Sequence, residues 1–219
     1  MFHIALDGPA GSGKSTLAKL ISEKLKIFYV DSGALYRIIG FYMKKHEIDI
    51  HSKNDVEQNL KNITMELKND SYYLNGEIIK EQIRNSESGY YASVVAKYDK
   101  VRNKVNEIIR NISSLKDIVI DGRDIGTVVL PDAEVKFFVT ASVEERAKRR
   151  HKELLSKGED ILFEKVKKEI LKRDANDSNR DIAPLKPAID SIIIDTDNKN
   201  IYEVLEEILI IIQEKKNGF

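Results

Sequence analysis

The chain has 219 residues, of which 42% are hydrophobic, so it can bury one sizeable core and still carry insertions. Its 36 Lys and Arg residues balance its 36 Asp and Glu residues, which argues against binding to nucleic-acid backbones or to an anionic membrane surface. The sequence contains no cysteine, which excludes disulfide bonds, a thiol nucleophile and a cysteine-based zinc site.

A strand and a glycine-rich loop open the chain. The apolar run FHIALD at 2–7 predicts a buried strand, and KSTLAKLISEKL at 14–25 has the apolar spacing of a helix. Between them, GPAGSGKST at 8–16 has the spacing of glycines, lysine and serine that binds nucleotide phosphates. A structural glycine turn is the alternative, but the order of strand, loop and helix favours phosphate binding. The residues predicted to bind ATP in this loop are Gly8, Pro9, Ala10, Gly11, Ser12, Gly13, Lys14, Ser15 and Thr16.

Two residues of this loop have predicted chemical roles of their own. Lys14 is expected to bridge the terminal phosphates as a point charge. The Ser15 hydroxyl is expected to bind Mg²⁺ that enters with the nucleotide. ATP and Mg²⁺ are therefore the predicted cofactors.

Four further strands are predicted by apolar runs at 27–31, 117–122, 134–141 and 191–196. The runs are nearly continuous, as in a parallel sheet that helices cover on both faces. The predicted fold is an α/β fold of the P-loop NTPase type, with three layers and a five-stranded parallel sheet. Ligands bind beyond the carboxyl ends of such strands, so we expect one crevice there. The strand ends carry Asp7-Gly8, Asp31-Ser32, Asp121-Gly122 and Asp195-Thr196.

About 85 residues separate the second predicted strand from the third, which is more than a simple crossover needs. Within them, ITMEL at 63–67 alternates apolar and polar residues, and Asn75-Gly76 between apolar runs predicts a hairpin. We therefore predict a small antiparallel sheet at about 60–85, followed by helical structure over 92–112. Later in the chain, two charged helical segments at 144–181 form a polar excursion that we expect to act as a lid.

Arginines beside the predicted strand ends and in the polar excursion suggest a second anion site. A guanidinium matches phosphate oxygens with two parallel hydrogen bonds, and phosphoryl transfer needs positive charge from several sides. For Arg37 and Arg123, which follow strand ends, phosphate binding is the favoured interpretation. For the arginines of the first charged helical segment, a surface salt bridge is an equally good interpretation. These are Arg146, Arg149 and Arg150.

A series of motifs extends over nearly the whole chain. The motifs read DGPAGSGKST, DSGALYR, DGRDIGTVVLPDA, ASVEERAKRR, RDANDSNR and PLKPAIDSIIIDT. In this order and spacing they resemble the bacterial cytidylate kinase family, whose members are nucleoside monophosphate kinases. The antiparallel insert is also similar to that family's, whereas adenylate kinases usually carry a small helical acceptor domain.

The resemblance implies an enzyme that phosphorylates CMP and dCMP with ATP and Mg²⁺, giving CDP and dCDP. An acceptor phosphate oxygen is already an anion, so direct in-line transfer needs positioning and charge stabilisation but no general base. A P-loop kinase for another small acceptor, such as AMP, UMP or shikimate, is the alternative. A nucleotide-dependent switch that binds a protein partner is disfavoured, because the sequence places arginines for a second anion.

The resemblance assigns roles to residues that match the family's motifs. The residues implied to bind the acceptor's α-phosphate are Ser32, Arg37 and Arg123. The residues implied to read the base are Ser93, Arg102 and Asp124. The residues implied to contact sugar and phosphate are Arg173, Asp177 and Arg180. The charges implied to act in catalysis are Lys14, Arg123 and Arg173, with the lid arginines Arg146, Arg149 and Arg150 on the ATP phosphates.

Base recognition at these positions has a chemical reason. Cytosine presents an amino donor at N4 and acceptors at N3 and O2, which a carboxylate and a guanidinium complement. Uracil would place a carbonyl against Asp124, a mismatch that costs about 1–3 kcal/mol. At Asp121, Mg²⁺ binding through water and a structural cap of the strand end are equally good interpretations. The family varies at Ala175, Asn176 and Ser178, which leaves the implied roles unchanged.

The expected organisation is one domain over 1–219, with a core at 1–35, 95–143 and 182–219, an acceptor-binding region at 36–94 and a lid at 144–181. The N-terminus enters the first strand without the features of a signal peptide, so a cytoplasmic location is expected. The resemblance implies a monomer whose partners are the small-molecule nucleotides CMP and dCMP, without nucleic acid or membrane.

Overall fold

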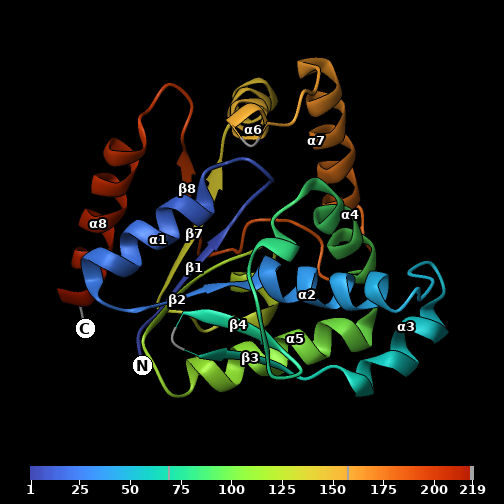
Figure 1. Cartoon of the computed structure of the whole chain (residues 1–219). Helices are drawn as coiled ribbons and strands as arrows, with labels where there is room; N and C mark the ends of the chain where they lie inside the picture. The colour runs from blue at the N-terminus through green and yellow to red at the C-terminus, as the bar shows by residue number, and fades with distance from the viewer. Residues whose placement is uncertain (69, 157, 218–219) are drawn as a thin grey trace. The chain divides into compact units, whose positions relative to one another are not determined.

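Residues 1–68, 70–156 and 158–217 are described by the computed structural model, and the chain divides into two units. The first unit comprises Met1–Tyr29 and Lys116–Phe219, and the second comprises Val30–Leu115. In Figure 1 the second unit runs from mid-blue to light green, and the first unit takes the remaining colours. The first unit therefore contains the glycine-rich loop and the region predicted as a lid, and the second contains the predicted insert.

A five-stranded parallel sheet has the order β2-β6-β1-β7-β8 (Figure 1). Its strands are β1 (His3–Asp7), β2 (Phe28–Asp31), β6 (Ile118–Asp121), β7 (Val135–Thr140) and β8 (Ile192–Asp195). The central strand β1 pairs in parallel with β6 and β7, so that Leu6 lies opposite Asp121 and Asp7 opposite Phe138. The five predicted strands are confirmed, and Asp7 and Asp121 end their strands at the same edge of the sheet.

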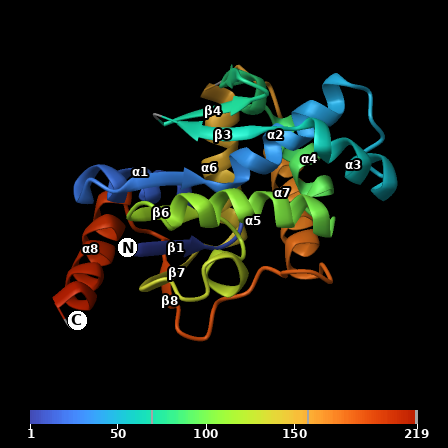
Figure 2. The same cartoon turned by 90° about the horizontal axis from the view of Figure 1, so that it is seen from below.

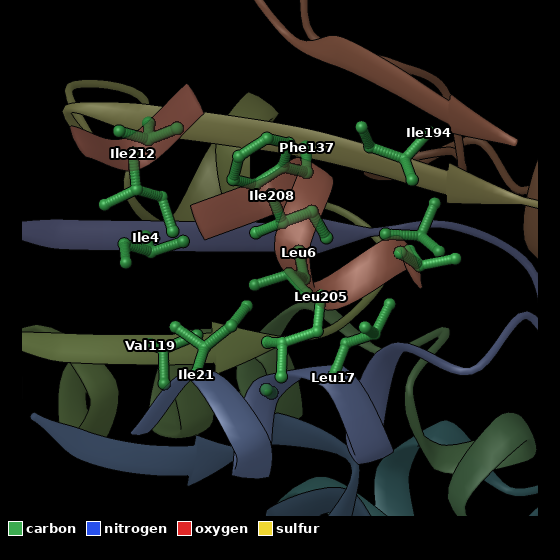
Figure 3. Close-up of a cluster of buried hydrophobic side chains, with 14 residues drawn as sticks. Ile4, Leu6, Leu17, Ile21, Val119, Phe137, Ile194, Leu205, Ile208 and Ile212 are labelled. Carbon is green, nitrogen blue, oxygen red and sulfur yellow. The ribbon is translucent and has the colours of Figure 1, made fainter. Parts of the chain in front are cut away.

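Helices α1 (Lys14–Leu25) and α8 (Ile201–Asn217) lie side by side along this sheet (Figure 1 and Figure 2). Their apolar side chains share one buried cluster with those of the strands (Figure 3). Leu17 and Ile21 of α1 point into the cluster with Ile208 of α8 and Leu6 of β1. Burying one such side chain is worth about 1.5–3 kcal/mol. The cluster therefore fixes α1, and with it the loop that precedes α1, on the sheet.

The region predicted as a lid consists of helices α6 (Val143–Ser156) and α7 (Phe163–Ser178). The two helices share an apolar cluster of their own that includes Ala147, Leu154 and Val166. A π-helical turn, η3 (Ile125–Val129), follows β6. Over the described ranges, the chain contains no helix that combines the length and apolar character needed to cross a membrane.

The second unit contains four helices and a three-stranded sheet within its described residues. The helices are α2 (Ser32–Lys45), α3 (Lys53–Asn59), α4 (Ser86–Val95) and α5 (Asp99–Ser113), with 3₁₀ turns η1 (Leu60–Asn62) and η2 (Glu81–Ile83). The sheet is antiparallel in the order β3 (Met65–Lys68), β4 (Ser71–Leu74), β5 (Glu77–Ile79). Asn75 and Gly76 join β4 to β5 with positive φ angles of 50° and 85°, as a tight hairpin requires. The predicted hairpin and antiparallel insert are confirmed.

The helical stretch predicted over 92–112 is divided in the structure, because the chain turns between α4 and α5. At this turn, Arg102 Nη1 donates a hydrogen bond of 3.2 Å to the carbonyl of Ala96, a group that the end of α4 leaves without a helical partner. The Tyr98 hydroxyl donates to the carbonyl of Ile50 at 2.9 Å. The Tyr98 contact joins residues 48 positions apart, so the spacing of apolar residues did not reveal the break.

Candidate active site

The phosphate-binding loop joins β1 to α1 in a conformation that requires glycine. Gly8 has a φ of +144°, and a Cβ atom there would lie 2.0 Å from the carbonyl oxygen of Val139 in β7. Gly13, immediately before α1, has a φ of +91°. Both conformations are strained or blocked for any residue with a side chain. Gly8 is therefore required by its close approach to β7, and Gly13 by its left-handed backbone conformation.

Lys14 is buried at the start of α1 and lies against its own loop. Its ammonium donates hydrogen bonds to the carbonyl of Pro9 at 2.7 Å and to the hydroxyl of Ser12 at 3.2 Å. Burial, followed by repulsion from Arg123, lowers the pKa of Lys14 well below its ordinary value of 10.5. A bound polyphosphate would add negative charge beside this ammonium, as the predicted bridging of the terminal phosphates by Lys14 requires.

Asp121, at the end of β6, joins the loop to β2 through both of its carboxylate oxygens. The Ser15 hydroxyl donates to Asp121 Oδ2 at 2.7 Å, and the Tyr29 hydroxyl donates to Asp121 Oδ1 at 2.7 Å. Ser15 and Asp121, the predicted metal residues, thus lie in contact. Both supply oxygen atoms, which are the donors that Mg²⁺ prefers, so the pair fits this ion. Tyr29 was not predicted as a site residue, because nothing in its strand distinguishes it from a packing aromatic.

Asp7, at the end of β1, was noted in the sequence only as a polar strand end. Its Oδ1 accepts the backbone N–H of Ile125 at 2.8 Å, and its Oδ2 accepts that of Gly126 at 2.7 Å. Burial raises the pKa of Asp7 from 3.8 to about 6, although the two backbone hydrogen bonds oppose the rise. The nearby charge of Asp124 adds to the rise, and that of Lys14 opposes it. Asp7 therefore links β1 directly to the turn that follows β6.

A cluster of arginines and carboxylates joins the loop after β6 to α7. Arg123 Nε donates to Asp177 Oδ2 at 2.9 Å, and Arg180 Nη2 lies 4.0 Å from Asp124 Oδ1. Burial favours protonation of Asp177, but the charges of Arg123, Arg173 and Arg180 outweigh it and hold the pKa of Asp177 below 3.8. Arg123, Arg173 and Arg180 thus lie close enough to Asp177 to act on its charge. A cluster of guanidinium groups of this kind suits an anionic ligand.

Arg146 of α6 is buried and holds three parts of the first unit together. Its guanidinium donates to the carbonyl of Ala10 in the phosphate-binding loop and to that of Ala141, both at 3.0 Å. It also pairs with Asp174 of α7 at 2.7 Å. The structure therefore places Arg146 against the loop, as a link between the loop and the two helices of the predicted lid.

The other two arginines of α6 have different surroundings. Arg149 donates to the side chain and the carbonyl of Thr196, both at 2.8 Å, and to Glu145 at 3.1 Å. One of its nitrogen atoms lies 3.9 Å from the position that a Cβ atom of Gly13 would take, so Arg149 borders the loop. Arg150 pairs with Glu153 of the same helix at 2.7 Å.

The predicted residues of the second unit form a separate set of contacts. Arg37 Nη2 pairs with Asp31 Oδ2 at 2.7 Å, while Asp31 Oδ1 accepts the N–H of Ala34 and caps α2 at 2.9 Å. The Tyr72 hydroxyl of β4 accepts the N–H of Asp31 at 2.8 Å and donates to its carbonyl at 3.0 Å. Asp31 and Tyr72 thus hold the start of α2 and the guanidinium of Arg37. The sequence indicated Asp31 only as a polar strand end, and it did not predict Tyr72 as part of the site.

The remaining predicted residues of this unit lie on three helices. Ser32 is buried at the start of α2 and Ser93 is half-buried in α4. Arg102 is buried in α5, with its guanidinium carbon 5.8 Å from the centre of the Tyr36 ring. This stacking on an aromatic ring adds to the hydrogen bond to Ala96 in fixing the arginine.

Comparisons with known proteins agree with these features. The profile of the family described as cytidylate kinase matches residues 4–214. The cytidylate kinase of Thermosipho melanesiensis is 52% identical over 213 residues, which cover 97% of both chains. That of Clostridioides difficile is 45% identical, covering 94% of this chain and 95% of its own. An uncharacterised protein from Eubacterium ventriosum shares the fold, with a TM-score of 0.56, 14% identity, and coverage of 97% of this chain and 99% of its own. The chain therefore belongs to the cytidylate kinase family.

Proposed function

We propose that this protein transfers the terminal phosphoryl group of ATP to CMP and dCMP by direct in-line displacement, giving CDP and dCDP. Membership of the cytidylate kinase family supports the predicted activity, and it confirms the predicted class of enzyme. The structural observation that carries the proposal lies in the first unit. The phosphate-binding loop follows β1, and the loop with Arg123 and Asp124 follows the neighbouring strand β6 at the same end of the sheet. Arg123 and Asp124 belong to the arginine cluster, in which they contact Asp177 and Arg180.

On the donor side, the loop from Gly8 to Thr16 holds the ATP phosphates in this proposal, and Lys14 bridges the terminal ones. Arg146, Arg149 and Arg150 are assigned to the ATP phosphates as part of the same proposal. Ser15 and Asp121 would hold Mg²⁺, which neutralises charge on the phosphate oxygens when it is bound. The Ser15 hydroxyl already donates its proton to Asp121, so its lone pairs remain for a cation.

On the acceptor side, a phosphate oxygen of CMP attacks without a general base. Arg123 and Arg173 supply positive charge to the transferring group, and Arg180 and Asp177 bind the sugar and phosphate. Asp177 orients Arg123 through their hydrogen bond of 2.9 Å, so this guanidinium is fixed before the acceptor binds. Preorganised charge of this kind stabilises a phosphoryl-transfer transition state without reorganisation during the reaction.

Ser32 and Arg37 are proposed to bind the acceptor's α-phosphate from the second unit. Asp31 holds Arg37 at 2.7 Å, which limits the rotamer freedom that binding would otherwise remove. The residues proposed to read the base are Ser93, Arg102 and Asp124. The carboxylate of Asp124 would accept the cytosine N4 amino group and would oppose the uracil O4 carbonyl.

The wider setting of the enzyme is part of the same proposal. We infer a monomeric cytoplasmic enzyme formed by one kinase domain over 1–219, with 144–181 acting as its lid. The monomer rests on the family resemblance. Its partners are the small-molecule nucleotides alone, which the exact balance of acidic and basic residues supports over a nucleic-acid or membrane surface.

A coupled assay of ADP release tests the proposal, with ATP and Mg²⁺ and with CMP, dCMP, UMP, AMP or shikimate offered separately. Turnover is expected with CMP and dCMP. Lys14→Met should lower kcat strongly, whereas Lys19→Met, on an exposed position of the same helix, should not. Turnover mainly with AMP or shikimate would contradict the proposed substrate and leave only nucleotide binding supported.

A further inference from the structure

Asp7 caps a helical turn that lies 118 residues further along the chain. Its two carboxylate oxygens accept the first two N–H groups of η3, at 2.8 Å and 2.7 Å. The side chain is only 4% exposed, so no water competes effectively for these bonds. The two residues immediately before the turn are Arg123 and Asp124, to which the proposed function assigns acceptor binding. Asp7 is therefore attached to the backbone that presents both of these side chains.

The position of Asp124 makes this cap unusual. Asp124 is the residue immediately before η3, where an aspartate ordinarily turns its own carboxylate to the N–H groups of the following helix. Its side chain makes no such cap bond. Instead, Asp124 Oδ1 lies 4.0 Å from Arg180 Nη2 of the arginine cluster. Asp7, at the end of β1, therefore caps the turn in place of Asp124.

We propose that Asp7 is a positioning residue for base selectivity, because its cap on η3 fixes the direction in which Asp124 presents its carboxylate. The inference rests on the proposed function, in which Asp124 reads the cytosine amino group. Without a carboxylate at position 7, the N–H groups of Ile125 and Gly126 are buried without acceptors. Asp124, the residue immediately before η3, would then turn its carboxylate back to accept these N–H groups. In that orientation the carboxylate no longer contacts the cytosine amino group.

The variant Asp7→Asn tests this inference. Its single carbonyl oxygen can accept one N–H group of η3, while its amide N–H₂ group faces the other. The ratio of kcat/KM for CMP to that for UMP is expected to fall about tenfold, with the KM for ATP changed less than about threefold. Glu134→Gln is the matched control, because Glu134 accepts the N–H of His3 at 2.7 Å at the opposite end of β1. This control should keep the wild-type ratio.

Asp124→Asn and the double variant separate this inference from the proposed function. If Asp124→Asn alone keeps the CMP to UMP ratio, the assignment of Asp124 to the base is wrong. If Asp124→Asn lowers the ratio while Asp7→Asn does not, only the positioning role of Asp7 is wrong. Equal losses for CMP and UMP in Asp7→Asn would also overturn it, because they indicate a purely structural role. In the Asp124→Asn background, Asp7→Asn should change the ratio no further.

Asp7→Glu provides a second test if Asp7→Asn does not fold, as judged by circular dichroism. Glutamate keeps the negative charge, but its longer side chain cannot place both carboxylate oxygens on the N–H groups of Ile125 and Gly126 without displacing the turn. We expect a shift of the CMP to UMP ratio in the same direction, of about two- to fivefold. An unchanged ratio in a folded Asp7→Glu variant would overturn the inference.

Discussion

The Tyr29 hydroxyl donates a hydrogen bond of 2.7 Å to Asp121, on the oxygen opposite the one that accepts from Ser15. The carboxylate is buried between the two hydroxyl groups and cannot rotate without losing one of these bonds. Because Ser15 donates its only hydroxyl proton to Asp121, its lone pairs point away from the carboxylate. Tyr29 therefore acts on Ser15 through Asp121, although helix α1 lies between the phosphate-binding loop and Tyr29 in the chain.

Tyr29→Phe removes one hydrogen bond to a charged group, which is worth about 1.5–3 kcal/mol. We expect kcat to fall about three- to tenfold and the Mg²⁺ concentration for half-maximal rate to rise, while the protein stays folded. Steady-state assays across a Mg²⁺ series check this expectation. Tyr202→Phe is the control, because Tyr202 is 65% exposed on α8. Identical Mg²⁺ dependence in Tyr29→Phe and the wild type would show that Tyr29 has no influence on the metal residues.

The Asp31–Arg37 pair predicts a change in acceptor binding. Both side chains are largely buried, at 12% and 21% exposure, so loss of the carboxylate charge leaves the guanidinium poorly positioned. Asp31→Asn is expected to raise the KM for CMP about tenfold and to leave the KM for ATP nearly unchanged. Glu87→Gln is the control, since Glu87 pairs with Lys44 in the same unit with both side chains half-exposed. A similar small effect from both variants would contradict the positioning of Arg37 by Asp31.

The residues that the sequence did and did not reveal differ in how their partners are arranged. The loop from Gly8 to Thr16 was predicted because its chemistry and its geometry lie within nine consecutive residues. Arg123 was predicted because it follows a recognisable strand end. Tyr29 contacts a partner 92 residues away and Asp7 one 118 residues away. Local spacing carries no information about such partners. The role of Tyr29 became visible only with β2 beside β6, and that of Asp7 only with β1 beside β6.

The same reasoning explains why the strands were predicted from the sequence, whereas the break between α4 and α5 and the contacts of Arg146 were not. Apolar runs predicted all five strands of the parallel sheet, and Asn75-Gly76 predicted the hairpin, because both signals are local. At the turn between α4 and α5, Arg102 bonds to the carbonyl of Ala96 six residues earlier, but Tyr98 bonds to that of Ile50, which lies 48 residues away. The paired contacts of Arg146 with Ala10 and Asp174 likewise join three separate elements. A charged helical pattern alone leaves such an arginine indistinguishable from a surface salt bridge.

The bond between Tyr72 and Asp31 predicts that the antiparallel insert supports the start of α2. The Tyr72 hydroxyl accepts from the N–H of Asp31 and donates to its carbonyl, and the side chain is 9% exposed. Tyr72→Phe leaves a buried N–H group and a carbonyl without this partner, so we expect a loss of about 1–3 kcal/mol in unfolding free energy. The KM for CMP should rise about two- to fivefold. Urea unfolding and steady-state kinetics check the two effects.

Tyr73→Phe is the control for this variant. Tyr73 neighbours Tyr72 in β4 but is half-buried, and its side chain points to the other face of the sheet because successive residues of a strand alternate. We expect its unfolding free energy to lie within about 0.5 kcal/mol of the wild type. If Tyr72→Phe behaves like Tyr73→Phe in both measurements, the insert does not support α2 through this hydroxyl.

The raised pKa of Asp7 predicts an unusual dependence of stability on pH. The pKa is about 6 in the folded protein and 3.8 as the ordinary value, so folding favours the protonated form. The contribution of Asp7 to stability is therefore fully present below about pH 4 and is lost as the pH rises through 6, by about 3 kcal/mol in total. Asp7→Asn lacks this group. Its unfolding free energy relative to the wild type should rise by about that amount between pH 4 and pH 7.

Asp177 provides a comparison of opposite sign within the same unit. The three arginines around it hold its folded pKa below 3.8, so its contribution to stability is present above this value and is lost as the pH falls. The unfolding free energy of Asp177→Asn relative to the wild type should therefore fall as the pH rises from about 3 to about 5. Urea unfolding followed by circular dichroism at a series of pH values measures both variants. A pH-independent difference between Asp7→Asn and the wild type from about pH 4 to pH 7 would mean that the carboxylate of Asp7 is not destabilised by its burial.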